Sequence, residues 1–62
     1  MTTWQWHNLI EDSGFQFCKA REGWALFDED DRTEVPGTWA RTKGDAVWLA
    51  VNKLELKEND NG

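Results

Sequence analysis

The stretch TKGDAVWLAVNKLELK, residues 42–57, decides the fold that the sequence predicts. Thr42 is a residue type that caps helix N-termini, and a carboxylate three positions later, Asp45, suits the positive end of a helix. Apolar side chains then recur at helical spacing as one stripe: Val47, Ala50, Val51 and Leu54. Lys53 and Lys57 lie near the negative C-terminal end, where cations are favoured. We therefore predict a helix over residues 42–57.

The apolar run AVWLAV at residues 46–51 has an alternative interpretation, because a continuous run of this kind is also typical of a buried strand. The length of the stretch, its capping residue and its alanines favour the helix. We expect this helix to pack against a β-hairpin and to hold the core.

A shorter helix is predicted at the N-terminus, where Thr2 or Thr3 precedes the segment WQWHNLIED, residues 4–12. One side of that helix carries Trp6, Leu9, Ile10 and Ser13. Gly14 follows and is a natural C-terminal stop.

A β-hairpin is predicted next, with strands over residues 15–20 and 24–27 and a loop of Arg21, Glu22 and Gly23. Gly is expected there because such loops often need a positive φ. If opposed residues keep the same parity, one face carries Phe15, Phe17, Ala25 and Phe27, and the other carries Cys18, Trp24 and Leu26. A bulge at Gly23 would change which residues face inward. Two helices do not easily cover both faces, so we expect some exposed aromatic surface.

The last predicted strand lies between a turn and the C-terminal helix. The segment VPGT, residues 35–38, fits a type II turn, with Pro and Gly at its two central positions. Residues 38–41, including Trp39, then form a short third strand. The predicted fold class is α+β: a short N-terminal helix and a three-stranded antiparallel sheet packed against a C-terminal helix, in the order α-β-β-β-α.

Length and composition bound the class of protein. The 62 residues make a single compact domain, 1–62, and we expect residues 58–62 to be a frayed polar tail. The 5 Trp side chains offset the small size of the core. Cys18 is the only cysteine, and a lone thiol fits a reducing compartment. Because we see neither a signal peptide nor a membrane span, we expect a cytoplasmic protein, in the host cytoplasm if a phage encodes it.

No residue pattern predicts an enzyme. The acidic run that begins at Asp28 fails as a calcium loop, because Thr33 and Trp39 stand where a Gly and a Glu are needed. Cys18 lies in a hydrophobic strand and His7 is the only imidazole, so we interpret both as packing residues. We therefore expect no catalytic residue, no metal site and no cofactor.

Direct nucleic-acid binding is a minor interpretation. Three-stranded sheets followed by a helix read DNA in some proteins, and phage integrase arm-binding domains and the plant AP2 domain have that outline. Four cations here could share one sheet edge: Lys19, Arg21, Arg41 and Lys43. The formal net charge of −5, however, argues against general affinity for nucleic acid or for an anionic membrane.

The acidic surface carries the main functional hypothesis. A rigid domain that displays dispersed carboxylates imitates the phosphates of a duplex for a protein whose groove is lined with Arg and Lys. Exposed Trp side chains would add anchors that slow dissociation. The predicted partner-binding residues are Asp28, Glu29, Asp30, Asp31, Glu34, Asp45, Glu55 and Glu58, with Trp24 and Trp39 as aromatic anchors.

With these residues the chain resembles the small acidic inhibitors carried by phages and mobile elements, and among them anti-CRISPR proteins. The resemblance covers size, charge and the expected compact α+β outline. It includes no signature motif, so it assigns no residue a role. It implies a stoichiometric inhibitor that blocks a CRISPR effector complex at its DNA-binding or PAM-reading surface.

Two alternatives stay open beside this hypothesis. The chain could be a small structural or adaptor module whose Trp residues meet a protein partner, with its acids serving only solubility. It could also be the sheet-type DNA binder described above. For the favoured hypothesis we expect a monomer whose partner is a protein with a basic nucleic-acid-binding surface, and neither nucleic acid itself nor a membrane.

Overall fold

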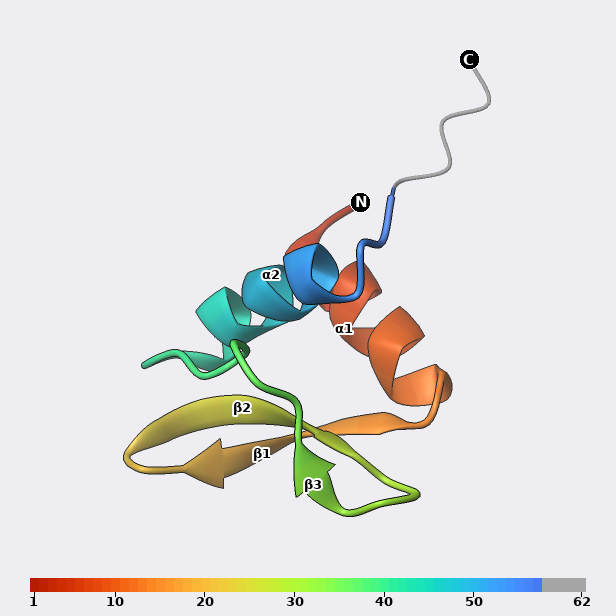
Figure 1. Cartoon of the computed structure of the whole chain (residues 1–62). Helices are drawn as coiled ribbons and strands as arrows, with labels where there is room; N and C mark the ends of the chain where they lie inside the picture. The colour runs from red at the N-terminus through yellow and green to blue at the C-terminus, as the bar shows by residue number, and fades with distance from the viewer. Residues whose placement is uncertain (58–62) are drawn as a thin grey trace.

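Both helices lie on the same face of a three-stranded antiparallel sheet (Figure 1). The computed structural model describes residues 1–57. Its elements are α1 (Thr3–Asp12), β1 (Phe15–Ala20), β2 (Gly23–Asp28), β3 (Thr33–Glu34) and α2 (Lys43–Lys53), and the sheet has the strand order β1-β2-β3. The predicted α+β class and α-β-β-β-α order are confirmed. The tail predicted at residues 58–62 lies outside the described residues.

Helix α1 begins where the sequence predicts, because Thr2 and Gln5 form a capping box. The Thr2 hydroxyl accepts a hydrogen bond from the Gln5 amide at 3.3 Å. In return, the Gln5 side chain accepts one from the Thr2 amide at 2.7 Å. At the other end Gly14 has a φ of 95°, so it acts as the predicted stop.

The buried side of α1 is narrow. Of the residues predicted to share one side of this helix, Trp6 and Ile10 are buried, whereas Leu9 is 40% exposed. Trp6 and Ile10 lie four residues apart and therefore follow one line along the helix. Leu9 lies on the flank of that line.

The hairpin turn is one residue shorter than predicted. Arg21 and Glu22 fill it, with φ values of 51° and 64°, as a two-residue type I′ turn requires. Gly23 belongs to β2 and pairs with Ala20, so the prediction that it supplies a positive φ in the loop is wrong. Its small size is needed instead, because a Cβ there would lie 2.3 Å from the carbonyl oxygen of Ala40. Gly23 thus lets the chain before α2 approach β2 closely.

The shorter turn changes which side chains share a face of the sheet. Phe17 pairs with Leu26, and both belong to the core between the sheet and the helices. Cys18 pairs with Ala25, and by alternation these two residues share the opposite face with Phe27. The predicted grouping of Phe17 with Ala25 and Phe27 is therefore wrong, because moving one residue from the loop into the strand reverses the parity.

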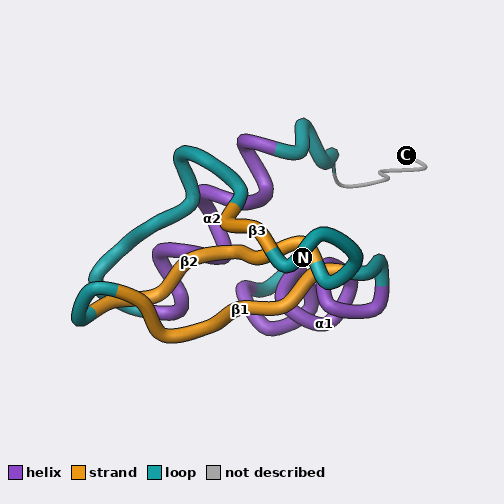
Figure 2. Tube along the Cα trace, turned by 60° about the horizontal axis from the view of Figure 1, so that its bottom comes forward, coloured by secondary structure: helices purple, strands orange, loops and turns teal. Residues whose placement is uncertain are grey.

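The third strand forms earlier in the chain than predicted. β3 is Thr33–Glu34, whereas the strand predicted at 38–41 makes only one bridge, from Ala40 to Trp24. Between the two, Gly37 has a φ of 81°, as the predicted type II turn requires. The strand prediction at 38–41 is wrong because this turn interrupts the pairing with β2. Figure 2 shows the loop after β3 returning along β2 toward α2.

The buried hydroxyl of Thr38 replaces the interrupted strand bonds. Thr38 is fully buried, and its Oγ1 accepts a hydrogen bond from the Leu26 amide at 3.0 Å and donates one to the Val35 carbonyl at 2.7 Å. The Val35 amide donates to the Leu26 carbonyl at 2.8 Å. The outer edge of β2 therefore stays hydrogen-bonded where the chain turns away from it.

Helix α2 starts as predicted, because the Thr42 hydroxyl accepts a hydrogen bond from the Asp45 amide at 3.2 Å. Asp45 lies in the first turn and Lys53 in the last, so each charge suits its end of the helix. The helical interpretation of the apolar run at 46–51 is confirmed over the strand.

The C-terminal end of α2 comes four residues before the predicted one. Glu55 has a φ of 55°, and its amide donates to the Asn52 carbonyl at 3.1 Å. The Leu56 amide donates to the Val51 carbonyl at 2.9 Å, which completes a Schellman motif. This reversal ends the helix at Lys53, so the prediction that residues 54–57 are helical is wrong.

The core lies between the sheet and the two helices. Its buried members are Trp6, Ile10, Phe17, Leu26, Ala40, Ala46, Val47, Ala50 and Val51. The predicted α2 stripe takes part, since Leu54 packs against this cluster while partly buried. Leu56 packs there as well, because the Schellman motif folds it back. Leu56 is not among the predicted core residues, because a helix that continued to residue 57 would carry it elsewhere.

The substitution Thr38→Val keeps the shape of the side chain and removes its hydroxyl. We expect the free energy of unfolding to fall by about 1–3 kcal/mol, because the buried Leu26 amide and Val35 carbonyl lose a partner. Urea denaturation followed by Trp fluorescence measures this change. Thr38→Ser is the matched control, since it keeps the hydroxyl and removes only a methyl group. Equal stability of the two variants would contradict the role given to the hydroxyl.

The substitution Glu55→Gly should stabilise the protein by about 0.5–1 kcal/mol. A side chain in the left-handed region costs more than the added freedom of Gly in the unfolded chain. Thermal melting followed by circular dichroism measures the gain. The control is Glu55→Ala, which removes the carboxylate but keeps the Cβ, so it should not stabilise the protein. A Glu55→Gly protein no more stable than Glu55→Ala would show that the backbone there is unstrained.

Candidate functional site

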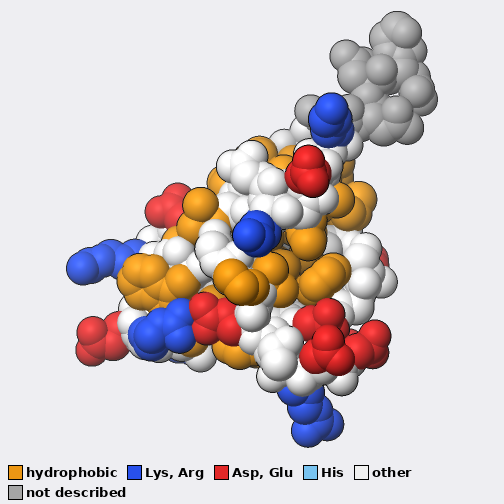
Figure 3. Space-filling view, in the orientation of Figure 1, with side chains coloured by type: hydrophobic (Ala, Val, Ile, Leu, Met, Phe, Trp, Pro, Cys, Tyr) orange, Lys and Arg blue, Asp and Glu red, His pale blue; other side chains and the backbone are white. Residues whose placement is uncertain are grey.

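Six of the 12 acidic side chains gather where the end of α1 meets the turn between β2 and β3. The Glu29 amide donates to the Gly14 carbonyl at 3.1 Å, and Phe15 pairs with Asp28, so these two segments lie together. Figure 3 shows acidic side chains grouped at this end of the molecule. We call this surface the acidic corner; its members are Glu11, Asp12, Asp28, Glu29, Asp30 and Asp31.

The turn that carries most of the acidic corner is held by its own hydrogen bonds. The Asp28 carboxylate accepts from the amides of Asp30 at 2.9 Å and Asp31 at 3.4 Å. The Arg32 amide donates to the Asp28 carbonyl at 2.7 Å. Glu29, Asp30 and Asp31 are exposed on this turn. Three carboxylates are thus presented to solvent from a turn whose backbone is ordered by the first acid of the run.

Glu11 and Asp12 were not among the predicted binding residues. They are distant from the acidic run in sequence, and only the hairpin register and the end of α1 bring them beside it. Glu11 is half-buried, and its carboxylate accepts a hydrogen bond from the Phe17 amide at 3.3 Å. Asp12 is exposed.

The remaining predicted acids do not join the acidic corner. Glu34 lies in β3 and pairs with Arg21, whose guanidinium donates hydrogen bonds at 2.9 and 2.6 Å. Asp45 lies in the first turn of α2, and Glu55 follows the end of that helix. Glu58 lies outside the described residues.

The pair of Arg21 and Glu34 has an electrostatic consequence. The hydrogen bonds from Arg21, together with its positive charge, lower the pKa of the Glu34 carboxyl below its usual value. The same bonds raise the pKa of Arg21. Glu34 is therefore charged but already neutralised by a neighbour, so it contributes less to the acidic surface than the exposed acids of the turn.

The two Trp residues predicted as anchors are both half-buried. Ammonium groups approach the Trp24 ring, that of Lys19 at 5.9 Å and that of Lys43 at 5.0 Å from the ring centroid. The Trp39 indole donates a hydrogen bond to the Ala20 carbonyl at 2.7 Å. Both rings therefore have structural contacts within the fold.

The exposed Trp residues lie on the helices instead. Trp4 of α1 is 58% exposed, and Trp48 of α2 is 42% exposed and donates its indole hydrogen bond to the Thr3 hydroxyl at 3.0 Å. A helical projection of the sequence indicates that Trp4 and Trp6 lie on different sides of α1. Trp4 lies two residues from the buried Trp6, and two residues on a helix point to different sides.

The four cations considered for DNA binding gather near the hairpin turn in two pairs. The ammonium groups of Lys19 and Lys43 both lie near the Trp24 ring. Arg21 and Arg41 line a small hollow of about 120 Å³ together with Glu22 and Trp39. Glu22 and Glu34 are interspersed with these cations, so the charge at this end of the described chain is mixed.

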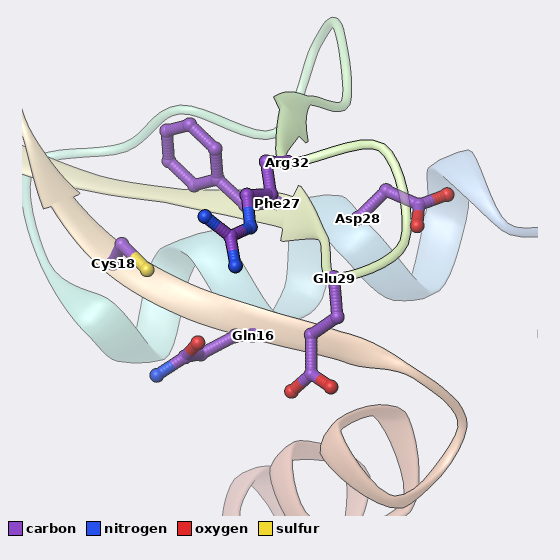
Figure 4. A pocket seen from close by; sticks show the side chains of 6 residues that line it. All are labelled: Gln16, Cys18, Phe27, Asp28, Glu29 and Arg32. Atoms are coloured by element: carbon purple, nitrogen blue, oxygen red, sulfur yellow. The ribbon is translucent and has the colours of Figure 1, made fainter.

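A larger hollow of about 420 Å³ lies on the sheet beside the acidic corner; it is lined by Gln16, Cys18, Phe27, Asp28, Glu29 and Arg32. Figure 4 shows the Arg32 guanidinium and the Cys18 sulfur directed into the hollow, while the Asp28 carboxylate points away from it. Within residues 1–57 Arg32 makes no ion pair, although four acids precede it in the turn. Arg32 therefore does not neutralise the exposed carboxylates of the acidic corner.

His7 and Cys18 lie on opposite sides of the sheet. The His7 ring stacks on Phe17 with the ring centroids 5.4 Å apart, and its Nε2 lies 3.5 Å from the Glu11 carboxylate. Cys18 follows Phe17 in β1, so its side chain points to the other face. An imidazole that activates the thiol would have to lie on the same face. The absence of a catalytic role for either residue stays a prediction.

Two further classes of site are absent from the described part of the chain. Within residues 1–57 no three His, Cys, Asp or Glu side chains are arranged to hold a metal ion. No helix in that range is long and apolar enough to cross a membrane.

Comparison with known proteins identifies no relative: no family model, no curated protein and no solved structure matches the chain. The surfaces described above are therefore the evidence for its function. Among them, the acidic corner is the largest group of like charges, and the exposed Trp4 is the most exposed large apolar side chain that is described.

The pair of Arg21 and Glu34 gives a pH-dependent test. NMR titration should find the Glu34 pKa below its usual value, and Arg21→Ala should return it toward that value. Because the folded-state pKa is lowered, the pair adds stability above the unfolded-state pKa, and that contribution is lost as the pH falls through the folded-state pKa. Arg41→Ala is the control, and it should leave the Glu34 titration unchanged. If the Glu34 pKa is the same in the Arg21→Ala variant as in the unaltered protein, the two residues are not paired in solution.

Proposed function

We propose that this protein is a non-enzymatic inhibitor that binds the basic nucleic-acid-binding surface of another protein through its acidic corner. The observation that carries the proposal is the gathering of six carboxylates at one end of the molecule, three of them exposed on a single hydrogen-bonded turn. A groove lined with Arg and Lys attracts such a surface as it attracts the phosphates of a duplex.

The ordered turn supports tight binding as well as attraction. A carboxylate on a flexible tail loses conformational freedom when it binds, and that loss weakens the complex. The Asp28 carboxylate orders the turn before any partner arrives. The Arg32 guanidinium is directed over the sheet and makes no ion pair within residues 1–57, so it does not neutralise the exposed acids. Attraction at long range should therefore show itself as a fast association rate.

A CRISPR effector complex is the specific partner that the resemblance to anti-CRISPR proteins implies. Its DNA-binding or PAM-reading surface has the basic chemistry that the acidic corner would recognise. Contact there would exclude the target duplex, so inhibition would be stoichiometric. We also propose that the protein acts in the cytoplasm, which would be the host cytoplasm if a phage encodes it.

In the adaptor alternative, aromatic side chains bind the partner. Trp24 or Trp39 would supply the binding energy, and the acids would only maintain solubility. Both rings are half-buried and hold contacts within the fold, which favours the acidic corner over these two anchors. Glu34, Asp45 and Glu55 remain candidates for peripheral contacts with the same partner.

Charge reversal distinguishes binding through the acidic corner from binding through the overall negative charge of the protein. The variant Glu29→Lys, Asp30→Lys, Asp31→Lys should lose most of its affinity for a partner captured from a bacterial lysate, measured by surface plasmon resonance. Asp28 is kept because it orders the turn. The control Glu22→Lys, Asp45→Lys, Glu55→Lys changes the net charge equally and affects at most peripheral contacts, so it should bind much better than the corner variant. Each exposed change should alter stability by only about 0.5 kcal/mol.

Competition and salt complete this test. Duplex DNA and the protein should exclude each other from the isolated partner, and a purified CRISPR effector with its target duplex is the first to try. Affinity should fall as salt rises, because exposed charges are screened over about 10 Å at 0.1 M. Simultaneous binding of DNA and protein would rule out the proposal. Loss of binding in Trp24→Ala or Trp39→Ala without any effect of salt would favour the adaptor.

A further inference from the structure

Helix α1 presents a face whose N-terminal part, as far as Ile10, carries no charged side chain in a strongly charged protein. Residues 1–10 contain no Asp, Glu, Lys or Arg, although these residues make up 31% of the chain. Trp4 lies on this face and is 58% exposed. Trp is enriched among the residues that supply most of the binding energy at protein interfaces, so an exposed Trp among uncharged neighbours suits a contact surface.

Three exposed side chains form a row along α1 at intervals of four residues: Trp4, Asn8 and Asp12. In that order they offer an indole N–H that donates, a carboxamide whose oxygen also lies 3.1 Å from His7 Nδ1 and whose N–H groups can donate, and a carboxylate that accepts. A reversed copy of the row matches it, since each Trp4 donor meets an Asp12 acceptor and the carboxamides meet in the middle. The row is therefore complementary to itself.

The charge at the ends of α1 also suits an antiparallel copy. The helix has no acid in its first turn and no base in its last, and Asp12 lies at its negative end, where an acid is unfavourable. By contrast, α2 places Asp45 at its start and Lys53 at its end. A second α1 running in the opposite direction would bring its Asp12 to the positive end of the first helix.

We infer that α1 is the contact surface of a symmetric dimer, in which two copies pair their Trp4–Asn8–Asp12 rows antiparallel about a two-fold axis at Asn8. A second copy is favoured over an unrelated partner because the row complements itself. The net charge of −5 makes two copies repel, and the uncharged face is where they can approach with the least repulsion. The dimer would take the place of the monomer expected from the sequence. The dimer shares only Asp12 with the acidic corner, and the acidic turn of residues 28–31 plays no part in it.

Sedimentation equilibrium of the full chain tests the dimer. We expect the mass to rise from 7.2 kDa toward twice that value between micromolar and millimolar concentration. The dimer should strengthen as salt is raised, because screening reduces the repulsion between the copies. Binding of a basic partner weakens under the same change, so the two proposals fail separately. A mass that stays at 7.2 kDa at millimolar concentration overturns the dimer.

Two variants test the row itself. Trp4→Ala should weaken the dimer by about tenfold or more. Leu49→Ala is the control, since it removes an exposed apolar side chain from the other helix and should leave the dimer unchanged. Asn8→Asp should abolish the dimer, because it sets two carboxylates against each other on the axis. Circular dichroism shows that each variant folds. Unchanged dimerisation of Trp4→Ala or Asn8→Asp overturns the proposal.

Crosslinking tests the axis. In a Cys18→Ser background, Asn8→Cys should form a disulfide-linked dimer under mild oxidation, because a residue on a two-fold axis lies close to its own copy. Glu22→Cys in the same background is the control, since the hairpin turn is exposed and distant from α1 in the chain. It should remain largely uncrosslinked. Equal crosslinking of the two variants, or crosslinking of neither, overturns the proposed axis.

Discussion

The hydroxyl of Thr38 determines how the second half of the chain meets the hairpin. Because it accepts from β2 and donates to the Val35 carbonyl, a tight turn is inserted into the third strand without leaving β2 unpaired. The inserted turn brings Ala40 opposite Trp24, and the cap of α2 follows two residues later at Thr42. The position of α2 over the sheet, and with it the packing of the core, therefore depends on one buried polar group.

Features that depend on neighbouring residues could be predicted from the sequence. Thr2 and Thr42 cap their helices through amides three positions away, so their roles can be read locally. The third strand could not be placed, because its pairing depends on the buried hydroxyl just described. Gly23 shows the same limit: its small size matters because of the carbonyl of Ala40, and nothing near it in the chain indicates that contact. The order of elements was thus easier to predict than their register.

The part of the candidate site that is formed by consecutive residues could be predicted. Residues 28–31 are an acidic run that is evident in the sequence. Glu11 and Asp12 join that run only through the fold. The predicted anchors Trp24 and Trp39 are both half-buried, because a ring in or beside a strand has contacts on several sides. Which aromatic ring stays exposed depends on how the two helices cover the sheet, and a short sequence does not reveal that.

The carboxylate of Glu11 has a consequence for how this protein tolerates being concentrated. It accepts from the Phe17 amide, which points away from β2, and so occupies the beginning of the free edge of β1. An uncovered strand edge is a template on which further strands add without limit, and fibres grow in this way. The end of α1 therefore covers the first part of this edge, and a strand that adds there must first displace the Glu11 carboxylate.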